Sequence, residues 1–339
     1  MSQRTVLTPQ MVRYDDFDDR GETRWLPFLM YFHRTDYRSD VINTDAKGFR
    51  LSHGAGDSAS AGGRPPSGPV RLLVGSSTAF GIGVNRDAAT ISSRLWTEYA
   101  PSAPWLNFAG RSFSSTQELL LFVLYRHLLP PQIDEIVVFS GLNDLAVARL
   151  PADQRGDHGA FFNCGEYFEQ MEALRVRHRM QLKEPGRLGR RRGRTAVDED
   201  VPVLPLGERI SLATELTARH LASWRLLAPG ARITFVLQPL ATWIRAEPSP
   251  EEELLFAELD ERSNFWELYG DIAVEKTGRR YAEALRGACE ELDVGFLDIS
   301  PVLAETVARR DWLFVDRAHF TDLGADIVAR LLAERSGIS

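Results

Sequence analysis

The sequence has few cysteines, no long apolar run and no leader segment. Its two cysteines, Cys164 and Cys289, form no CxxC pair and are too few for a disulfide framework in a chain of 339 residues. No window approaches the ~18 uninterrupted apolar residues of a membrane-spanning helix. The first residues, MSQRTVLTPQMVRYDDFDD, lack the apolar segment of a secretory signal. These absences predict a cytoplasmic protein with reduced thiols and no membrane span.

An excess of basic residues is absent too. The chain has 40 Lys and Arg residues against 47 Asp and Glu residues, which gives a formal net charge of −7. A general nucleic-acid-binding surface needs an excess of positive charge, so no nucleic-acid partner is expected. No cluster of His, Cys, Asp and Glu has the spacing of a zinc site, so no metal is expected either.

The apolar content is high enough for a large core, because 44% of the residues are hydrophobic and 26% are charged. Residues 1–53 predict an N-terminal extension that packs on the main domain. Residues 54–69, GAGDSASAGGRPPSGP, are almost all small or proline, and they predict a flexible linker. Residues 70–339 predict the main domain, with an insertion at about 151–205. The arginine-rich part of that insertion, 174–194, predicts a solvated loop or a site for an anionic partner.

From residue 70 onward, short apolar runs alternate with segments of helical periodicity. The runs predict five buried strands, at 70–74, 105–108, 133–139, 233–237 and 294–299. Helices are expected over 88–99, 116–129, 211–227, 250–269, 272–292 and 321–334. Strands separated by helices form a parallel sheet with helices on both faces. The predicted fold class is therefore α/β, a three-layer α/β/α arrangement around five parallel strands, of the flavodoxin-like kind.

Polar residues gather in four segments that are expected at one edge of this sheet, where ligands bind in open parallel sheets. The segments are 75–81, 107–112, 141–144 and 314–321. Together they contain serine hydroxyls, backbone donors, an asparagine amide, a carboxylate and an imidazole, which are the groups that acyl transfer requires. The first segment lacks both the GK[ST] ending and the GxGxxG spacing of nucleotide-binding loops. No cofactor is therefore expected.

These four segments resemble, in the same order, the four blocks of the SGNH or GDSL-type hydrolase family. The resemblance extends roughly from Val70 to the C-terminus and includes the phrases FSSTQELLLF, FVLQP and FVDRAHFTDLGADIVARLL. It implies that Ser77 is the nucleophile, His319 the general base and Asp316 the carboxylate that orients the base. It also implies three oxyanion donors, namely the Ser77 N–H, a backbone N–H of block two and the Asn143 amide.

Two positions depart from the family pattern. Ser76 stands where the family usually has aspartate, which makes Ser76 an alternative nucleophile, although the register of the block favours Ser77. In block two, Ala109 and Ser112 stand where glycine is usual. The backbone donor of that block is therefore either the Ser112 N–H or the Gly110 N–H.

The function that the resemblance implies is that of a serine hydrolase, which cleaves an acyl ester or thioester through an acyl-serine intermediate. One alternative is an acyltransferase with the same triad, acting in a biosynthetic pathway, if 151–205 and the N-terminal segment exclude water from the site. Another is a catalytically silent binding module on the same scaffold. The aromatic residues Trp243 and Trp266 are candidates for lining an acyl pocket, and a place in the core is the alternative. The pattern predicts neither the acyl group nor the oligomeric state.

Overall fold

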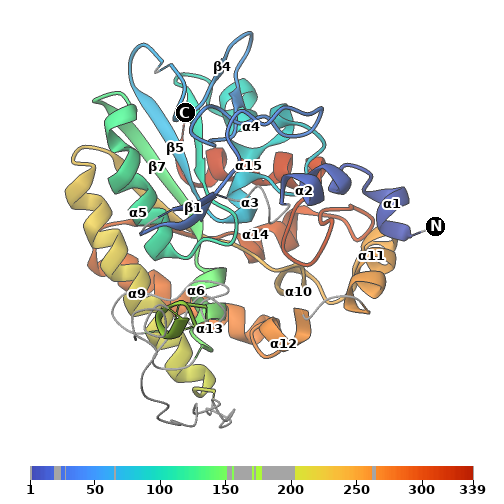
Figure 1. Ribbon diagram of the computed structural model, residues 1–339. Coiled ribbons are helices and arrows are strands. Elements are labelled where there is room, and N and C mark those ends of the chain that lie inside the picture. The colour runs from blue at the N-terminus through green and yellow to red at the C-terminus, as the bar shows by residue number, and fades with distance from the viewer. Residues whose placement is uncertain are drawn as a thin grey trace, which may run out of the picture.

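The computed structural model describes residues 2–18, 24–26, 28–64, 66–150, 155, 170–171, 173–177, 203–261 and 265–338. A five-stranded sheet lies at its centre, in the order β6-β5-β7-β8-β9, and every neighbouring pair of strands is parallel (Figure 1). The strands are β5 (Val70–Gly75), β6 (Trp105–Ala109), β7 (Ile133–Ser140), β8 (Arg232–Leu237) and β9 (Gly295–Asp298). Counted along the sheet, this is the order 2-1-3-4-5 of flavodoxin-like folds. The predicted fold class is confirmed.

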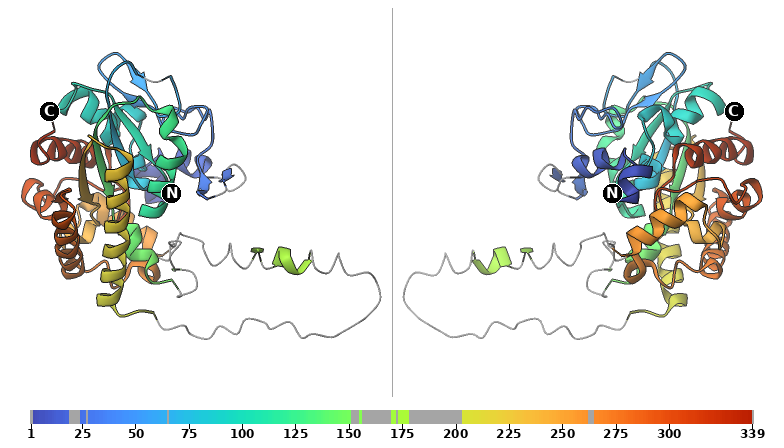
Figure 2. Two further views of the ribbon diagram at one scale, coloured as in Figure 1. Left: turned by 90° about the vertical axis from the view of Figure 1, so that its left-hand side faces the viewer. Right: turned by 90° about the vertical axis from the view of Figure 1, so that its right-hand side faces the viewer.

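Helices cover both faces of the sheet, as the two side views show (Figure 2). The helices that share a core with one face are α5 (Ser115–Tyr125), α9 (Leu206–Leu227) and α13 (Glu275–Glu291). Those on the other face are α4 (Ile91–Arg94), α14 (Ile299–Thr306) and α15 (Asp322–Arg335). Leu72 and Leu73 of β5 lie in opposite cores, because successive side chains of a strand point to opposite faces. A strand covered on both faces reads as a continuous apolar run, which is why the sequence identified all five strands.

Local capping explains why two of the predicted helices begin where they do. At α5, the side chains of Ser114 and Gln117 form a capping box with the first backbone N–H groups. At α15, the Thr321 hydroxyl accepts the Gly324 N–H. Both helices start directly after segments that carry candidate site residues, so the caps also fix the ends of those segments.

Two predicted helices are divided in the structure. The segment 88–99 consists of the 3-10 turn η1 (Asp87–Ala89), helix α4 and the π-helical turn η2 (Leu95–Tyr99). The division arises because the Thr90 side chain accepts the Ser93 N–H and so starts a new helix at Ile91. The segment 250–269 contains α11 (Pro250–Asp260) and α12 (Phe265–Tyr269) instead of one helix.

The N-terminal segment 2–53 shares the hydrophobic cores of the sheet domain. Its elements are α1 (Gln3–Leu7), α2 (Met11–Phe17), β1 (Arg24–Leu26), β2 (Met30–Phe32) and β3 (Ser52–His53). Strands β1 and β2 form an antiparallel pair. Phe32 and Phe49 belong to the same buried cluster as Val74 of the central strand β5. The described part of this segment therefore packs against the body of the sheet.

The segment 54–69, expected as a flexible linker, contains ordered structure. Strand β4 (Ser58–Ala59) pairs with β3, and Ala61 is buried. Small residues pair here through their backbones, which needs no apolar side chain, so composition alone did not reveal the hairpin. The predicted division into extension, linker and main domain stays a prediction.

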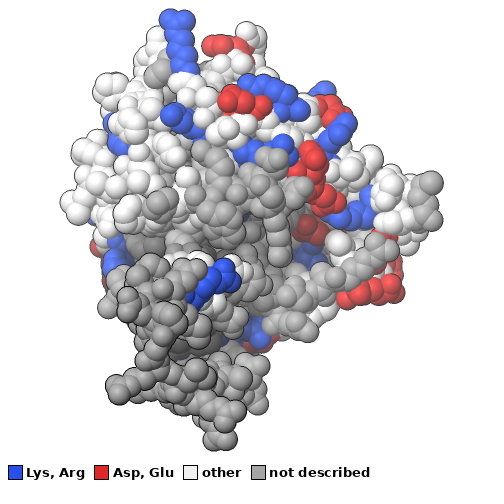
Figure 3. All heavy atoms as spheres, in the orientation of Figure 1, with Lys and Arg blue, Asp and Glu red and all other residues white. Residues whose placement is uncertain are grey.

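The predicted insertion at about 151–205 lies mostly outside the described residues. Cys164 and all of the arginine-rich segment 174–194 except 174–177 belong to the part that is not described. Elsewhere, no described helix is long and apolar enough to cross a membrane. On the face seen in Figure 3, basic and acidic side chains lie next to one another and do not gather into a patch of one sign.

Candidate active site

The strand order places a topological switch point at the carboxyl ends of β5 and β7, the position of the ligand-binding crevice in open parallel sheets. The connection after β5 runs to β6 on one side, and the connection after β7 runs to β8 on the other side, and ligands bind at such a switch point. The short helix α3 (Ser77–Phe80) follows β5, and α6 (Leu142–Val147) follows β7. The Thr78 hydroxyl donates to the Ala318 carbonyl at 3.0 Å, which brings the first and last sequence blocks together.

Three of the predicted site residues form a hydrogen-bonded chain in this crevice. Ser77 Oγ lies 2.7 Å from His319 Nε2, and His319 Nδ1 lies 2.7 Å from Asp316 Oδ2. Because Nδ1 faces a carboxylate, it carries the ring hydrogen, which leaves Nε2 as an acceptor for the Ser77 proton. The side chains of His319 and Asp316 are 20% and 29% exposed, so both are partly accessible to solvent.

The second oxygen of Asp316 fixes the carboxylate to its own loop. Asp316 Oδ1 accepts the N–H groups of Ala318 and His319 at 2.8 and 2.9 Å. Burial alone would raise the pKa of Asp316, but the neighbouring His319 and these donors outweigh burial, and the pKa of the carboxyl is lowered. The carboxylate therefore stays ionised and can hold the imidazole in one orientation.

The neighbouring serine, Ser76, points away from the imidazole. It is 1% exposed, and its hydroxyl donates to Gln238 Oε1 at 2.8 Å. A Cβ on Gly75 would lie 2.2 Å from the Phe139 carbonyl oxygen, so only glycine allows this close turn out of β5. After this turn, the Ser77 hydroxyl lies next to His319, and the Ser76 hydroxyl lies in the protein interior. The sequence contained Gln238 within the phrase FVLQP but gave no signal that it would bind Ser76.

The loop after β6, which is block two of the sequence, contains two candidate backbone donors, and one of them is already hydrogen-bonded. The Gly110 N–H donates to the Gly75 carbonyl at 3.0 Å and is therefore occupied. Within the described residues, the Ser112 N–H has no acceptor, and Ser112 has a φ of +55°. Asn143 Nδ2 donates to the Phe113 carbonyl at 2.8 Å, which leaves its second amide hydrogen available. Ser112 and Asn143 are thus linked through Phe113 at one side of the crevice.

The two tryptophans have different surroundings. Trp243 is 4% exposed, and its indole N–H donates to the Ile272 carbonyl at 2.8 Å. It also lines a pocket of about 370 Å³ with Asp298 and Ser300, and its place in an acyl pocket stays a prediction. The pattern could not separate the two possibilities because an aromatic residue after a strand suits either. Trp266 of α12 is 46% exposed, and its ring lies 4.7 Å from the guanidinium carbon of Arg317. Only Trp266 lies beside the segment that carries Asp316 and His319.

A buried polar network lies behind Asn143. Its neighbour Asp144 accepts the Ser115 hydroxyl at 2.7 Å and the Ser115 N–H at 3.1 Å, and this hydroxyl lies 2.8 Å from His220 Nδ1. Burial raises the pKa of Asp144 to about 6, and burial lowers the pKa of His220 to about 4. The network ties the start of α5 to α6.

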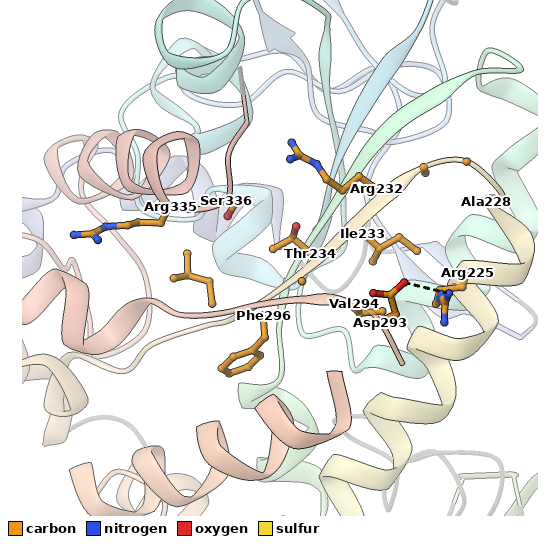
Figure 4. Close-up of a pocket in the computed structure, with 14 residues that line it drawn as sticks. Arg225, Ala228, Arg232, Ile233, Thr234, Asp293, Val294, Phe296, Arg335 and Ser336 are labelled. Atoms are coloured by element: carbon orange, nitrogen blue, oxygen red, sulfur yellow. Dashed lines mark ion pairs between the residues drawn. The ribbon is translucent and has the colours of Figure 1, made fainter. Parts of the chain in front are cut away.

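A separate pocket of about 560 Å³ lies at the opposite end of the sheet (Figure 4). Arg232, Thr234 and Phe296, which line it, belong to the first residues of β8 and β9. Parallel strands place their starts at the edge away from Ser77, so this pocket is not part of the crevice. In the part of the chain that the structure describes, no group of three or more His, Cys, Asp or Glu side chains could hold a metal ion.

Comparisons with known proteins give similarity at low identity. No family model matches the chain, and no curated protein matches it either. The M. smegmatis aryl esterase matches at 15% identity and a TM-score of 0.44, over 80% of this chain and 100% of that protein. An extracellular lipase from Streptomyces rimosus matches at 12% identity and a TM-score of 0.41, over 80% of this chain and 100% of the lipase.

A third similar structure is longer than this chain. A protein from Bacteroides ovatus described as a GDSL-like lipase matches at 15% identity and a TM-score of 0.41, over 80% of this chain. The match covers 52% of the Bacteroides ovatus protein, so the chain spans about half of its length. These proteins are described as an esterase and two lipases. The fold class itself is established by the strand order of the chain.

Proposed function

We propose that this protein is a serine hydrolase of the SGNH type, which cleaves an acyl ester or thioester through an acyl-serine intermediate. The observation that carries the proposal is the hydrogen-bonded chain from Ser77 through His319 to Asp316, with 2.7 Å at both steps. This arrangement supports a nucleophile, a base and a carboxylate that orients the base. It favours catalysis over the silent binding module, which has no need for a serine hydroxyl that faces an imidazole.

The proposed first step forms the acyl-enzyme. His319 Nε2 takes the proton of Ser77 Oγ, and the oxygen attacks the carbonyl carbon of the ester. The negative charge on the carbonyl oxygen of the tetrahedral intermediate is stabilised by the N–H groups of Ser77 and Ser112 and by the Asn143 amide. Ser77 is the first residue of α3, where a backbone N–H has no acceptor within its own helix. When the intermediate collapses, the bond to the alcohol or thiol breaks, and His319 protonates that leaving group.

The proposed second step regenerates the serine. His319 removes a proton from water, and the resulting hydroxide attacks the acyl carbon. The intermediate collapses to the carboxylic acid, and the imidazolium returns its proton to Ser77 Oγ. An acyltransferase would follow the same steps with an alcohol or amine in place of water. The segment 151–205, on which that alternative depended, lies mostly outside the described residues.

Labelling with a fluorophosphonate tests the proposal. This reagent forms a covalent bond with activated serines, so we expect it to modify the peptide that contains Ser77. Labelling is expected to be lost in Ser77→Ala, to be retained in Ser76→Ala and to be much slower in His319→Ala. If the wild-type protein is not labelled at all, the proposed function is wrong and the silent binding module is favoured.

Hydrolysis and transfer are separated by an added acceptor. With p-nitrophenyl acetate as the acyl donor, a hydrolase releases acetate at a rate that added glycerol leaves nearly unchanged. An acyltransferase instead turns over faster with the acceptor and yields the acetylated acceptor as its main product. We expect the first result, and the second would replace the hydrolase with the transferase.

A further inference from the structure

Ser112 has a backbone conformation that serine seldom adopts. Its φ of +55° lies in the left-handed region, which glycine reaches readily and which is unfavourable for residues that have a Cβ. The side chain of Ser112 is exposed. The surroundings of the loop must therefore impose the conformation, and two residues far away in the sequence contact it.

The first of these residues is Tyr31 of strand β2. Its hydroxyl donates to the Ser112 carbonyl oxygen at 2.9 Å, and its ring lies 5.9 Å from the ring of Phe113. Tyr31 is 9% exposed and is held in the antiparallel pair of β1 and β2. The hydrogen bond fixes the orientation of the peptide unit that follows Ser112.

The second is His33, which is 2% exposed. Its Nε2 accepts the Arg111 N–H at 3.1 Å, and its Nδ1 donates to the Gly48 carbonyl at 3.0 Å. An imidazole that donates at one nitrogen and accepts at the other is held in a single tautomer. The bond fixes the orientation of the peptide unit that precedes Arg111.

The Ser112 N–H belongs to the peptide unit between these two anchored units. The Arg111 side chain adds a third link to the N-terminal segment, because it forms an ion pair with Asp18 and lies 5.4 Å from the centre of the Phe17 ring. The orientation of this donor is therefore set on both sides by residues that precede the sheet domain in the sequence.

We propose that Tyr31 and His33 are positioning residues, which hold the Ser112 N–H in the direction that stabilises the oxyanion. The inference rests on the proposed function, since it assigns a role to that N–H. It also explains the departure from the family pattern in block two. Where the family usually has a glycine, a residue that reaches positive φ readily, this chain has a serine whose loop contacts the N-terminal segment.

Removal of one hydroxyl tests the inference, with p-nitrophenyl acetate as the probe. We expect Tyr31→Phe to lower kcat about tenfold and to change KM less than about twofold, because the donor acts mainly in the transition state. Tyr37→Phe is the matched control, since the Tyr37 hydroxyl lies in the same segment but bonds to Asp16 at 2.7 Å. The control is expected to stay within about twofold of the wild-type kcat.

The Ser112→Gly background separates positioning from general stability. Glycine adopts positive φ readily, so Tyr31→Phe is expected to cost less than about threefold in kcat when it is combined with Ser112→Gly. An equal loss of kcat in both backgrounds would overturn the inference, as would an unchanged kcat in Tyr31→Phe alone. Thermal unfolding of the wild type, Tyr31→Phe, Ser112→Gly and the double variant shows whether a loss of kcat results from a loss of the fold.

His33 gives a second, independent variant in case Tyr31→Phe does not fold. His33→Gln retains an acceptor for the Arg111 N–H, whereas His33→Leu removes it. We expect Gln to recover most of the kcat that Leu loses, and equal losses would contradict the role of His33. The proposed function fails separately, because in that case the wild-type protein itself neither hydrolyses the ester nor reacts with the fluorophosphonate.

Discussion

The two sides of the crevice are held in place in different ways. On the side of the base, Asp316 accepts N–H groups two and three residues further along the chain and orients His319 within one short segment. On the oxyanion side, the loop of Arg111 and Ser112 is held by Tyr31 and His33, across sequence separations of 81 and 78 residues.

This difference separates what a local motif can encode from what it cannot. A DxxH spacing fixes its own geometry, because the carboxylate, the backbone donors and the imidazole lie on consecutive residues. The loop of Ser112 has one hydrogen bond of its own, from the Phe113 N–H to the Gly110 carbonyl at 3.4 Å, and further contacts with distant residues. Its geometry depends on a second segment, and sequence changes in that segment act on the site from a distance.

The largest expected effect comes from removal of the nucleophile. Ser77→Ala is expected to lower kcat for p-nitrophenyl acetate by about 10⁴-fold or more, because no other hydroxyl contacts His319 Nε2 within the described residues. Ser76→Ala is the control and is expected to retain kcat within about threefold, since its hydroxyl bonds to Gln238 in the interior. A larger loss in Ser76→Ala than in Ser77→Ala would reverse the assignment.

The second-largest effect on kcat is expected for Asp316→Asn, on the side of the base. We expect kcat to fall about 10³-fold, because an asparagine can turn its amide towards Nδ1 and leave Nε2 as the protonated nitrogen, which cannot accept from Ser77. KM is expected to change little. The measurement is the steady-state rate from pH 6 to pH 9, and a variant with wild-type kcat at any pH in that range would contradict the role of Asp316.

Asn143→Ala removes a donor on the oxyanion side and is expected to cause a smaller loss of kcat. Removal of one preorganised donor costs about 10²-fold in kcat, and the bond to the Phe113 carbonyl is lost as well. Combined with Tyr31→Phe, the two losses are expected to be less than multiplicative, since Phe113 and Ser112 are neighbours in one loop. Fully multiplicative losses would show that the two residues act independently.

The smallest expected effect is on stability, through Asp144 behind Asn143. Its pKa is raised to about 6 in the folded state, so between its ordinary value and pH 6 the folded state binds more protons than the unfolded state. This group therefore lowers the free energy of unfolding as the pH rises through that range, by at most about 3 kcal/mol.

Asp144→Asn removes this contribution because its side chain does not titrate. The measured quantity is the unfolding free energy of the variant minus that of the wild type. We expect this difference to be about 2 kcal/mol larger at about pH 7.5 than at about pH 4.5. Urea unfolding at the two pH values measures it. A difference that does not depend on pH would contradict a raised pKa of Asp144.

The sheet and the four site segments could be predicted because their signals are local. Doubly covered strands are apolar throughout, and Ser77, Asn143 and His319 lie at fixed positions in short motifs. Other features depend on contacts between distant residues and had no local signal. Examples are the bond of the Ser76 hydroxyl to Gln238 and the bond of the Gly110 N–H to the Gly75 carbonyl.

The surroundings of Trp243 could not be predicted from local sequence either. Its place after β8 suited a pocket as well as a core, and its packing against Gly278 and its bond to the Ile272 carbonyl involve residues far along the chain. The supports of Ser112 are the clearest case, because residues 31 and 33 belong to no motif of the main domain. Long-range pairing of this kind cannot be read from one sequence.

The most direct test of the central claim is to trap the acyl-enzyme. The protein is mixed with p-nitrophenyl acetate, quenched in acid within the first turnover and analysed by mass spectrometry of its peptides. The account predicts one added acetyl group on Ser77, which is absent in Ser77→Ala and still present in Ser76→Ala. Turnover of the ester with the acetyl group on another residue, or with no acetyl-enzyme at all and no burst of p-nitrophenol, would contradict it.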